Sequence, residues 1–334
     1  MKTSELLFRL IRNNFLTPYR IYNAVKAVIS WKLKLNNPIG LPPVVMIEPT
    51  NYCNLHCPLC LTGINKLNRK QGFMSYENYL HILDDLSSTT MILSLYFSGE
   101  PFMHKEIIPM IHEAKNRNIF VRISTNGHFL NSETSLLLLQ SGLDHLIIGI
   151  DGATSETYES MRCGGDYLRV IEGIKCIVET KKRLNIKSPH ISLQFIVTSY
   201  NEHEIDSIKK LFKDLGADSL RIKPAYLYND SFILNRTKYV SNINKRQDVL
   251  FDCWRIWLSS TILWDGNVVP CCYDEQGKIL LGNLLNKKFV DIWKGNTFSN
   301  FRKMVKLNRK EIPLCNLCNS DLFDNVSAVM SKND

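Results

Sequence analysis

The chain has 334 residues, 45% of them hydrophobic and 22% charged, which is ordinary for a globular protein of one or two domains with a large core. Its formal net charge is +9, but residues 1–36 hold seven Lys or Arg residues against Glu5 and contribute +6 of it. The rest of the chain carries only +3. This balance argues against a general nucleic-acid-binding surface, so no nucleic-acid partner is expected.

The cysteine pattern, the apolar runs and the N-terminus indicate the cellular location of the protein. Ten cysteines stand in tight groups, which is typical of metal binding in an intracellular chain and not of a disulfide scaffold. No apolar run approaches the roughly 18 residues of a membrane-spanning helix. The N-terminus lacks an apolar region followed by a small-residue cleavage site, so no signal peptide is predicted. We therefore expect a cytoplasmic protein.

Residues 1–43 form a basic N-terminal segment that ends in a linker at residues 36–43. Two apolar-periodic stretches separated by Pro18 predict two helices. The second stretch carries an apolar stripe of Ile21, Tyr22, Val25, Val28 and Ile29. We expect a helical pair packed on the main domain. The alternative is a docking surface for a partner protein or an anionic membrane.

Residues 44–225 alternate apolar strands with amphipathic helices, which predicts a parallel sheet covered by helices. The predicted strands cover residues 44–49, 91–101, 119–127, 143–152, 190–201 and 217–225, and the predicted helices cover residues 74–86, 105–118, 132–142, 167–184 and 204–216. The expected α/β architecture is a partial (βα)6 TIM-like barrel, with a flavodoxin-like open sheet as the alternative. Residues 226–250 are predicted to be a connector, followed by a small cysteine-rich domain at residues 251–334.

The loop after the first predicted strand carries Cys53, Cys57 and Cys60. Thiolates suit zinc or iron–sulfur iron. A structural zinc site closes with four ligands, and His56, next to Cys57, would point elsewhere in most loop geometries. A 4Fe–4S cluster normally takes four cysteines, so three would leave one iron open to an exogenous ligand.

This C-x3-C-x2-C loop resembles that of the radical S-adenosylmethionine (SAM) superfamily. The resemblance implies a 4Fe–4S cluster on the three cysteines, with the open iron chelated by the amino and carboxylate groups of SAM. An electron from the cluster then cleaves SAM reductively, and the resulting 5′-deoxyadenosyl radical abstracts hydrogen from a substrate. An external electron donor such as flavodoxin or ferredoxin is expected.

Further motifs at successive strand ends are similar to those of the same family. The resemblance assigns SAM binding to Gly99 and Glu100 in SerGlyGluPro, Ser124 and Asn126 in SerThrAsnGly, Asp151 in IleAspGly, and Arg162. Glu100 would receive the amino group and Arg162 would pair with the carboxylate. A zwitterionic cofactor needs one buried acid and one guanidinium, each aimed at its opposite charge. Many relatives carry serine where this chain has Gly149, which leaves no side-chain contact there.

The second cysteine group comprises Cys253, Cys271, Cys315 and Cys318, a count that zinc would also permit. Residues 260–274 predict a hairpin that turns at Asp265-Gly266. This region resembles the shortened, "twitch" form of the SPASM extension, which implies one auxiliary 4Fe–4S cluster on these four cysteines, with Cys272 competing for the place of Cys271. Four protein ligands leave no iron open, so such a cluster would carry electrons.

The resemblance implies a radical SAM enzyme, and we expect a net oxidation, or dehydrogenation, of a small polar metabolite such as a sugar or aminocyclitol. One alternative is modification of a ribosomal peptide or protein by a maturase. The other is a non-enzymatic zinc-binding interaction protein. No catalytic acid or base is assigned. The residues considered and left without a role are Cys163, Cys176, Lys223, Tyr226, Tyr228 and Asp274.

Overall fold

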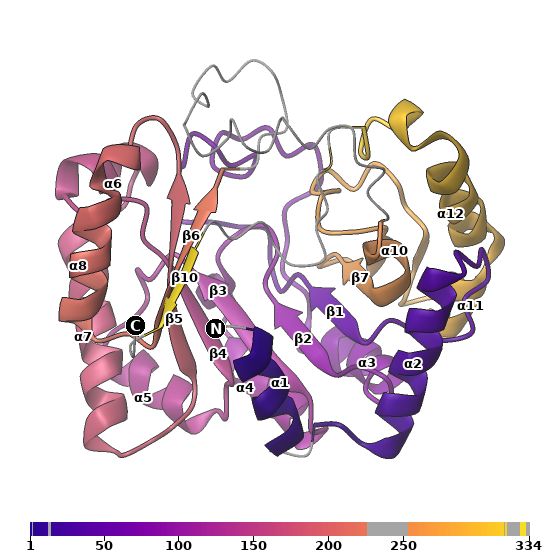
Figure 1. Ribbon diagram of the computed structural model, residues 1–334, viewed down its shortest axis with the longest axis horizontal. Coiled ribbons are helices and arrows are strands. Elements are labelled where there is room, and N and C mark those ends of the chain that lie inside the picture. The colour runs from indigo at the N-terminus through magenta and orange to yellow at the C-terminus, as the bar shows by residue number, and fades with distance from the viewer. Residues whose placement is uncertain (2, 13–14, 226–252, 317, 319–327, 332–334) are drawn as a thin grey trace.

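Figure 1 shows the computed structural model of the chain, which describes residues 1, 3–12, 15–225, 253–316, 318 and 328–331. The core of the sheet is made by the parallel strands β1 (Val44–Ile47), β2 (Ile92–Leu95), β3 (Phe120–Thr125), β4 (His145–Gly149), β5 (His190–Val197) and β6 (Ser219–Pro224). The predicted connector, residues 226–250, lies outside the described residues, as do Tyr226 and Tyr228. The predicted domain boundaries stay predictions.

Strands β1 to β6 stand in chain order across the sheet, and each pairs in parallel with the next. A flavodoxin-like sheet reverses its strand order at a switch point. The consecutive order therefore contradicts that alternative and confirms the partial barrel. Every residue of β2 and β4 is buried, which explains why these strands are nearly all apolar in the sequence.

Helices cover the strands on the outside of the barrel, as the apolar periodicity predicted. They are α3 (Tyr76–Leu86), α4 (Ile107–Asn116), α5 (Ser132–Gln140), α6 (Ser155–Met161), α7 (Tyr167–Arg183) and α8 (Ile205–Leu215), with the 3₁₀ turns η1 (Pro101–Met103) and η2 (Glu202–Glu204). Several begin at a side chain that accepts a hydrogen bond from the first helical turn, namely Ser75, Asn131, Thr154 and Asp166. Helix α6, which ends beside Arg162, was not predicted.

The C-terminal region extends the same sheet. It contains α10 (Arg255–Leu258), β7 (Ser259–Ile262), β8 (Asn267–Val269), β9 (Gly282–Asn283), α11 (Phe289–Lys294), α12 (Asn296–Asn308), the turn η4 (Arg309–Glu311) and β10 (Ala328–Ser331). Strand β7 runs parallel to β1, with Ser259 opposite Val44, and it pairs with β8 in the predicted hairpin. Strand β10 pairs antiparallel with β6 at the other edge of the sheet. The cysteine-rich region is thus joined to the barrel by backbone hydrogen bonds.

The N-terminal segment forms α1 (Thr3–Arg12) and α2 (Pro18–Lys32). Pro18 occupies the first turn of α2, after Thr17 accepts the capping hydrogen bond from the Arg20 amide. The helices pack on the barrel as expected, but the apolar stripe of α2 from Ile21 to Ile29 is exposed, so it is not the packing face. No helix among the described residues is both long and apolar enough to cross a membrane.

Arg20 anchors α2 to the barrel. Its side chain is buried, and its guanidinium donates hydrogen bonds to the carbonyls of Phe15, Ser87, Arg117 and Asn118. Ser87 and Arg117 are the C-terminal caps of α3 and α4. A buried cation there satisfies carbonyls that have no partner within their helices and complements the negative ends of the helix dipoles.

We expect Arg20→Leu to lower the free energy of unfolding by about 3 kcal/mol, because it leaves several buried carbonyls without a donor. Chemical denaturation monitored by circular dichroism measures this change. Arg12→Leu, at the exposed end of α1, is the matched control and should change stability by less than about 0.5 kcal/mol. Equal losses in the two variants would contradict the anchoring role of Arg20.

Candidate active site

A cavity of about 360 Å³ opens at the carboxyl ends of the barrel strands. All of the residues assigned to the first cluster and to SAM line this one cavity, namely Cys53, Cys57, Cys60, Gly99, Glu100, Ser124, Asn126, Asp151 and Arg162. Its walls also include apolar side chains such as Leu55, Met161 and Ile196. Strand ends that meet at one edge of a parallel sheet bring these residues together although they span more than a hundred positions.

Glu100 is a buried carboxylate held by three donors. Its Oε1 accepts hydrogen bonds from the Thr125 hydroxyl at 2.8 Å and the Phe102 amide at 3.1 Å, and its Oε2 accepts one from the Asn126 amide at 2.7 Å. Burial raises the pKa of Glu100 to about 7, although these hydrogen bonds act in the opposite direction. An amino group in the cavity would offer this carboxylate the positive partner that it lacks. Thr125 was missed by the sequence analysis.

Arg162 supplies the opposite charge. Its Nε donates to Asp151 Oδ2 at 2.7 Å, and Asp151 Oδ1 accepts the Ile196 amide at 2.8 Å. Burial alone would lower the pKa of Arg162, but Asp151 and the Cys57 thiolate raise it above its ordinary value. Asp151 therefore orients Arg162 as well as lining the cavity. A Cβ atom on Gly149 would lie 2.4 Å from Arg162 Nη2, so the absence of a side chain at residue 149 makes room for the guanidinium.

Asn126 is oriented by His128, a buried residue that the sequence analysis did not single out although it directly follows SerThrAsnGly. The backbone amide of Asp166 donates to His128 Nε2 at 2.8 Å, so the ring proton lies on Nδ1, 3.2 Å from Asn126 Oδ1. Burial lowers the pKa of His128, which favours this neutral form. The Asn126 amide nitrogen then points toward Asn54 Oδ1 at 2.8 Å and lies 4.0 Å from Cys53 Sγ.

The cysteine loop is fixed by its neighbours. The Glu100 amide donates to the Tyr52 carbonyl at 2.8 Å, and the His56 amide donates to the Cys163 carbonyl at 2.8 Å. The Cys163 thiol instead lies 3.4 Å from the Ser160 carbonyl, and Cys163 is not among the residues lining this cavity.

The donor set fits a cluster with several irons better than a single ion. Among the described residues, no three His, Cys, Asp or Glu side chains are placed to hold one metal ion. The three loop thiols nevertheless line the same cavity, and a cubane binds each thiolate at a different corner, so its ligands stand farther apart. Burial raises the pKa of Cys53 to about 11 and also raises that of Cys57. Bound metal cations would hold these thiols as thiolates.

The thiols of the second cysteine group affect one another's pKa values. Burial raises the pKa of Cys271 well above its ordinary value, and the neighbouring thiols of Cys272, Cys253 and Cys318 raise it further. Burial likewise raises the pKa of Cys315 to about 12, with added contributions from Cys253 and Cys318. These mutual effects mean that the four proposed ligands are electrostatic neighbours. That Cys271 and not Cys272 is the ligand stays a prediction.

Three other residues of this region, at positions 273–275, are also placed by the structure. Asp274 is buried and accepts the backbone amides of Lys278 and Ile279, both at 2.9 Å, so it stabilises a turn. Tyr273 and Glu275, on either side of it, line the cavity. Sequence reasoning did not find these two residues, because no motif marks them.

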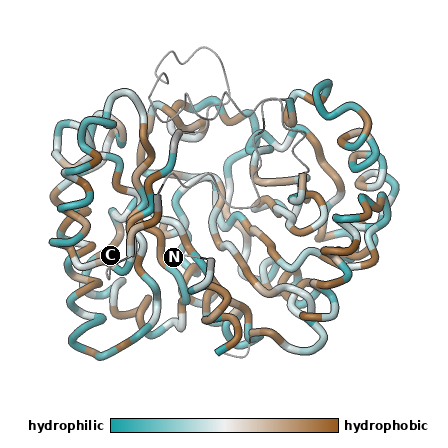
Figure 2. Tube along the Cα trace, in the orientation of Figure 1, coloured by the Kyte–Doolittle hydropathy of each residue, from teal (hydrophilic) through white to brown (hydrophobic). Residues whose placement is uncertain are grey.

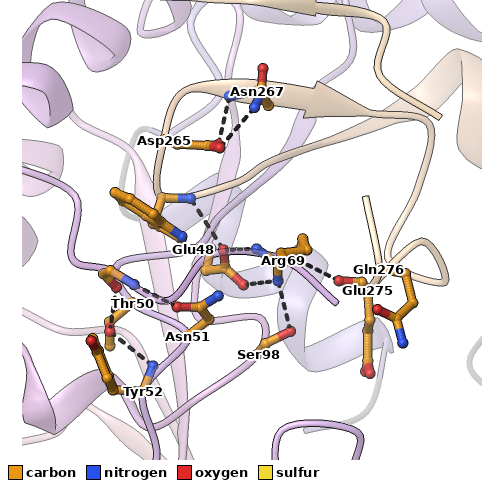
Figure 3. Close-up of polar contacts among 12 residues, drawn as sticks. Glu48, Thr50, Asn51, Tyr52, Arg69, Ser98, Asp265, Asn267, Glu275 and Gln276 are labelled. Atoms are coloured by element: carbon orange, nitrogen blue, oxygen red, sulfur yellow. Dashed lines mark hydrogen bonds and ion pairs between the residues drawn. The ribbon is translucent and has the colours of Figure 1, made fainter. Parts of the chain in front are cut away.

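A buried ion pair connects the barrel, the cysteine loop and the C-terminal region (Figure 3). Arg69 donates to both carboxylate oxygens of Glu48, at 2.7 and 2.9 Å, and the side chain of Glu48 is fully buried. The Trp264 amide donates to the same carboxylate at 3.1 Å, and Arg69 Nε donates to the Glu275 carbonyl at 2.5 Å. The pair thus ties the end of β1 to two segments of the C-terminal region.

We expect Arg69→Met to lower the free energy of unfolding by about 4 kcal/mol, because it leaves the Glu48 charge buried without a partner. Denaturant titration at neutral pH measures the change. Adding Glu48→Gln to Arg69→Met removes that charge and should recover part of the loss. A double variant as unstable as Arg69→Met would contradict this explanation.

We expect Gly99→Ala to disturb the cysteine loop. Gly99 has a φ of +75°, and an added Cβ would lie 2.5 Å from the Tyr52 carbonyl oxygen. Gly142→Ala is the matched control, because Gly142 has a φ of +78° and a Cβ there would meet only the Lys115 side chain at 3.4 Å or more. Both variants should lose about 1 kcal/mol from backbone strain. Iron bound after anaerobic reconstitution should fall only in Gly99→Ala, and equal iron content would contradict the contact's importance.

Comparison with known protein families agrees with this geometry. The model of the radical SAM superfamily matches residues 47–212, and the SPASM model, an iron–sulfur cluster-binding domain, matches residues 253–319. The first match covers the cysteine loop and the strands β2 to β5, and the second covers the second cysteine group.

Individual proteins are similar over most of the chain. A tungsten-containing aldehyde ferredoxin oxidoreductase cofactor-modifying protein from Pyrococcus furiosus is 25% identical, over 78% of this chain and 83% of its own. An S-adenosyl-L-methionine-dependent 2-deoxy-scyllo-inosamine dehydrogenase from Niallia circulans is 25% identical, over 83% of this chain and 92% of its own. The fold matches that of SuiB from Streptococcus suis bound to precursor peptide SuiA with a TM-score of 0.66 and 16% sequence identity. The match covers 93% of this chain and 78% of that one.

Three loop thiols, a buried acid and a guanidinium line one cavity, as expected for the family that these matches identify. The chain belongs to the radical SAM superfamily and carries a C-terminal SPASM domain, and it is an enzyme that uses SAM and 4Fe–4S clusters.

Proposed function

We propose that this enzyme catalyses the net oxidation of a small polar metabolite, such as a sugar or an aminocyclitol. In this proposal a hydrogen atom leaves a substrate C–H bond to the 5′-deoxyadenosyl radical, and the resulting substrate radical loses a proton and one more electron. Cys253, Cys271, Cys315 and Cys318 would hold an auxiliary 4Fe–4S cluster, which could accept that electron. Similarity to an aminocyclitol dehydrogenase along 92% of its length supports this reaction class.

In this proposal, the described residues hold both cofactors. Cys53, Cys57 and Cys60 bind the first cluster, which supplies the electron for SAM cleavage when an external donor such as flavodoxin or ferredoxin reduces it. Glu100 receives the SAM amino group and Arg162 its carboxylate. The remaining SAM contacts come from Gly99, Ser124 and Asn126, with Asp151 holding Arg162 in place.

The observation that carries the proposal is the mixed lining of the cavity. Tyr273 and Glu275 belong to the SPASM region and lie within three residues of Cys272, yet they line the same cavity as Glu100 and Arg162. A substrate in this cavity would therefore contact the SAM site on one element and the segment bearing auxiliary-cluster ligands on another. That position suits a reaction in which a substrate radical passes an electron onward. The polar groups of Tyr273 and Glu275 suit a polar substrate.

Peptide or protein modification is the second candidate. The fold similarity to SuiB bound to its precursor peptide favours it. Because the family members are enzymes, the family assignment favours either reaction over a non-enzymatic zinc-binding interaction protein.

Anaerobic reconstitution should load about eight irons per chain, as expected for two 4Fe–4S clusters. With SAM and dithionite the protein should release 5′-deoxyadenosine, and with the correct aminocyclitol or sugar it should form a product lighter by two hydrogens. Mass spectrometry measures both products. Zinc in place of iron, with no SAM cleavage, would overturn the proposal.

Removing an auxiliary ligand separates the two clusters. Cys315→Ala should lose about four irons and the oxidised product while retaining 5′-deoxyadenosine release. Cys176→Ala, a half-buried cysteine whose thiol lies near Ser132 on α5, is the control and should behave as the wild type. Undiminished oxidation by Cys315→Ala would contradict the electron-carrying role, and modification of a peptide alone would favour the second candidate.

A further inference from the structure

Helix α2 packs on the protein through a side that combines the apolar Ala27 and Trp31 with three buried polar residues, Arg20, Asn23 and Ser30. Asn23 is buried, donates to the Leu41 carbonyl at 2.8 Å and accepts the Leu41 amide at 2.9 Å. Ser30 is fully buried and accepts the Ile39 amide at 3.0 Å. Together with Arg20, these residues bind the backbone of the barrel and of the linker. Because these hydrogen bonds fix its rotation, α2 cannot turn its apolar side inward without leaving buried polar groups unpaired.

The opposite side of α2 is apolar and exposed. We call it the apolar face, and it consists of Ile21, Tyr22, Val25, Val28 and Ile29, each between 41% and 60% exposed. Surface helices of globular proteins show the reverse arrangement, with the apolar stripe toward the core. Contiguous apolar side chains at helical spacing on a surface mark an interaction site.

Helix α1 adds further exposed apolar side chains. Leu7, Phe8 and Ile11 are each more than half exposed, although Leu10 packs against the barrel with Phe15. The hydrophobic colouring of α1 is visible at the lower edge of Figure 2. Glu5 of the same helix lies 2.9 Å from His190 Nδ1, so α1 is held at the amino-terminal end of the strands.

The charges that the N-terminal segment itself contributes to this surface are, apart from Glu5 near its start, of one sign. Residues 6–47 contain no Asp or Glu. Cations stand along the same stretch, with Arg12, Lys32 and Lys34 exposed and Lys26 half-buried, its Nζ lying 4.9 Å from the Tyr22 ring centroid. A complementary partner is therefore apolar where it meets α2 and anionic around it. A bilayer containing anionic lipids has both properties, with acyl chains for the aliphatic side chains and headgroups for the cations and for tyrosine hydroxyls.

We propose that the apolar face of α2, assisted by the exposed apolar residues of α1, docks on the surface of an anionic membrane. The helices lie on the surface and do not span it. Docking leaves the active site open, because α1 and α2 lie in the lower part of Figure 1 whereas the strands β5 and β6 point toward its upper edge, where the cavity-forming strand ends lie. The proposal is independent of the reaction proposed above.

The test is co-sedimentation of the reconstituted full chain with phosphatidylcholine vesicles, with and without phosphatidylglycerol. The wild type should bind the anionic vesicles, bind neutral vesicles more weakly, and release as ionic strength rises. Val25→Asp/Ile29→Asp places two charges on the apolar face and should lower the partition coefficient about tenfold or more. Its release of 5′-deoxyadenosine should equal that of the wild type, which shows that it is folded.

Leu168→Asp/Leu307→Asp is the matched control, since both leucines are exposed apolar residues outside the N-terminal helices. It should bind anionic vesicles as the wild type does. The proposal is overturned if the wild type binds no vesicles, if Val25→Asp/Ile29→Asp binds as well as the wild type, or if the control loses binding equally. It is also overturned if sedimentation equilibrium shows a self-association that Val25→Asp/Ile29→Asp abolishes while vesicle binding is absent, because the face would then meet a second copy.

Discussion

The buried pair of Glu48 and Arg69 is the contact on which the arrangement of the active site depends. The two residues lie at either end of the loop that carries the three cysteines, so their hydrogen bonds close that loop at its base. The same two side chains bind Trp264 and Glu275 of the C-terminal region through backbone groups. Because a buried charge is costly without its partner, the pair admits little variation in geometry. It thereby sets the cysteine loop and the SPASM region in one relative position.

Within that frame, two charges of opposite sign are held on neighbouring strand ends. Glu100 is oriented by the end of β3 and Arg162 by Asp151 after β4. Protein groups form hydrogen bonds with both the Glu100 carboxylate and the Arg162 guanidinium. These hydrogen bonds hold the two side chains in place before a ligand binds. Such fixed groups need little reorganisation when a zwitterion binds, which is the usual advantage of a preorganised site. Gly99 and Gly149 contribute by lacking a side chain where backbone or guanidinium atoms approach closely.

The opposite end of the barrel follows a different logic. There the N-terminal helices satisfy buried polar groups with Arg20, Asn23 and Ser30 and leave aliphatic side chains outside. The two ends of the barrel thus differ. The carboxyl ends of the strands carry the residues of the active-site cavity, and the helices at the amino ends carry exposed apolar side chains. The near-neutral charge of the remaining chain makes the basic character of residues 1–36 a local property of that surface.

The sequence by itself determined the order of the six barrel strands and of five of the helices that cover them, the cysteine groups and the motif residues at strand ends, because these signals are local spacings and apolar periods. Only the tertiary structure decided that β7 pairs with β1, that Tyr273 and Glu275 enter the cavity, and that Thr125 and His128 support Glu100 and Asn126. Most of these contacts join residues far apart in the chain or depend on strand direction, and the local contact of His128 with Asn126 is oriented by the distant Asp166 amide, so no local pattern records them. The exposure of the apolar face of α2 could not be predicted for a similar reason. Periodicity shows which residues share a helix face, whereas hydrogen bonds to distant backbone groups decide which face packs on the core.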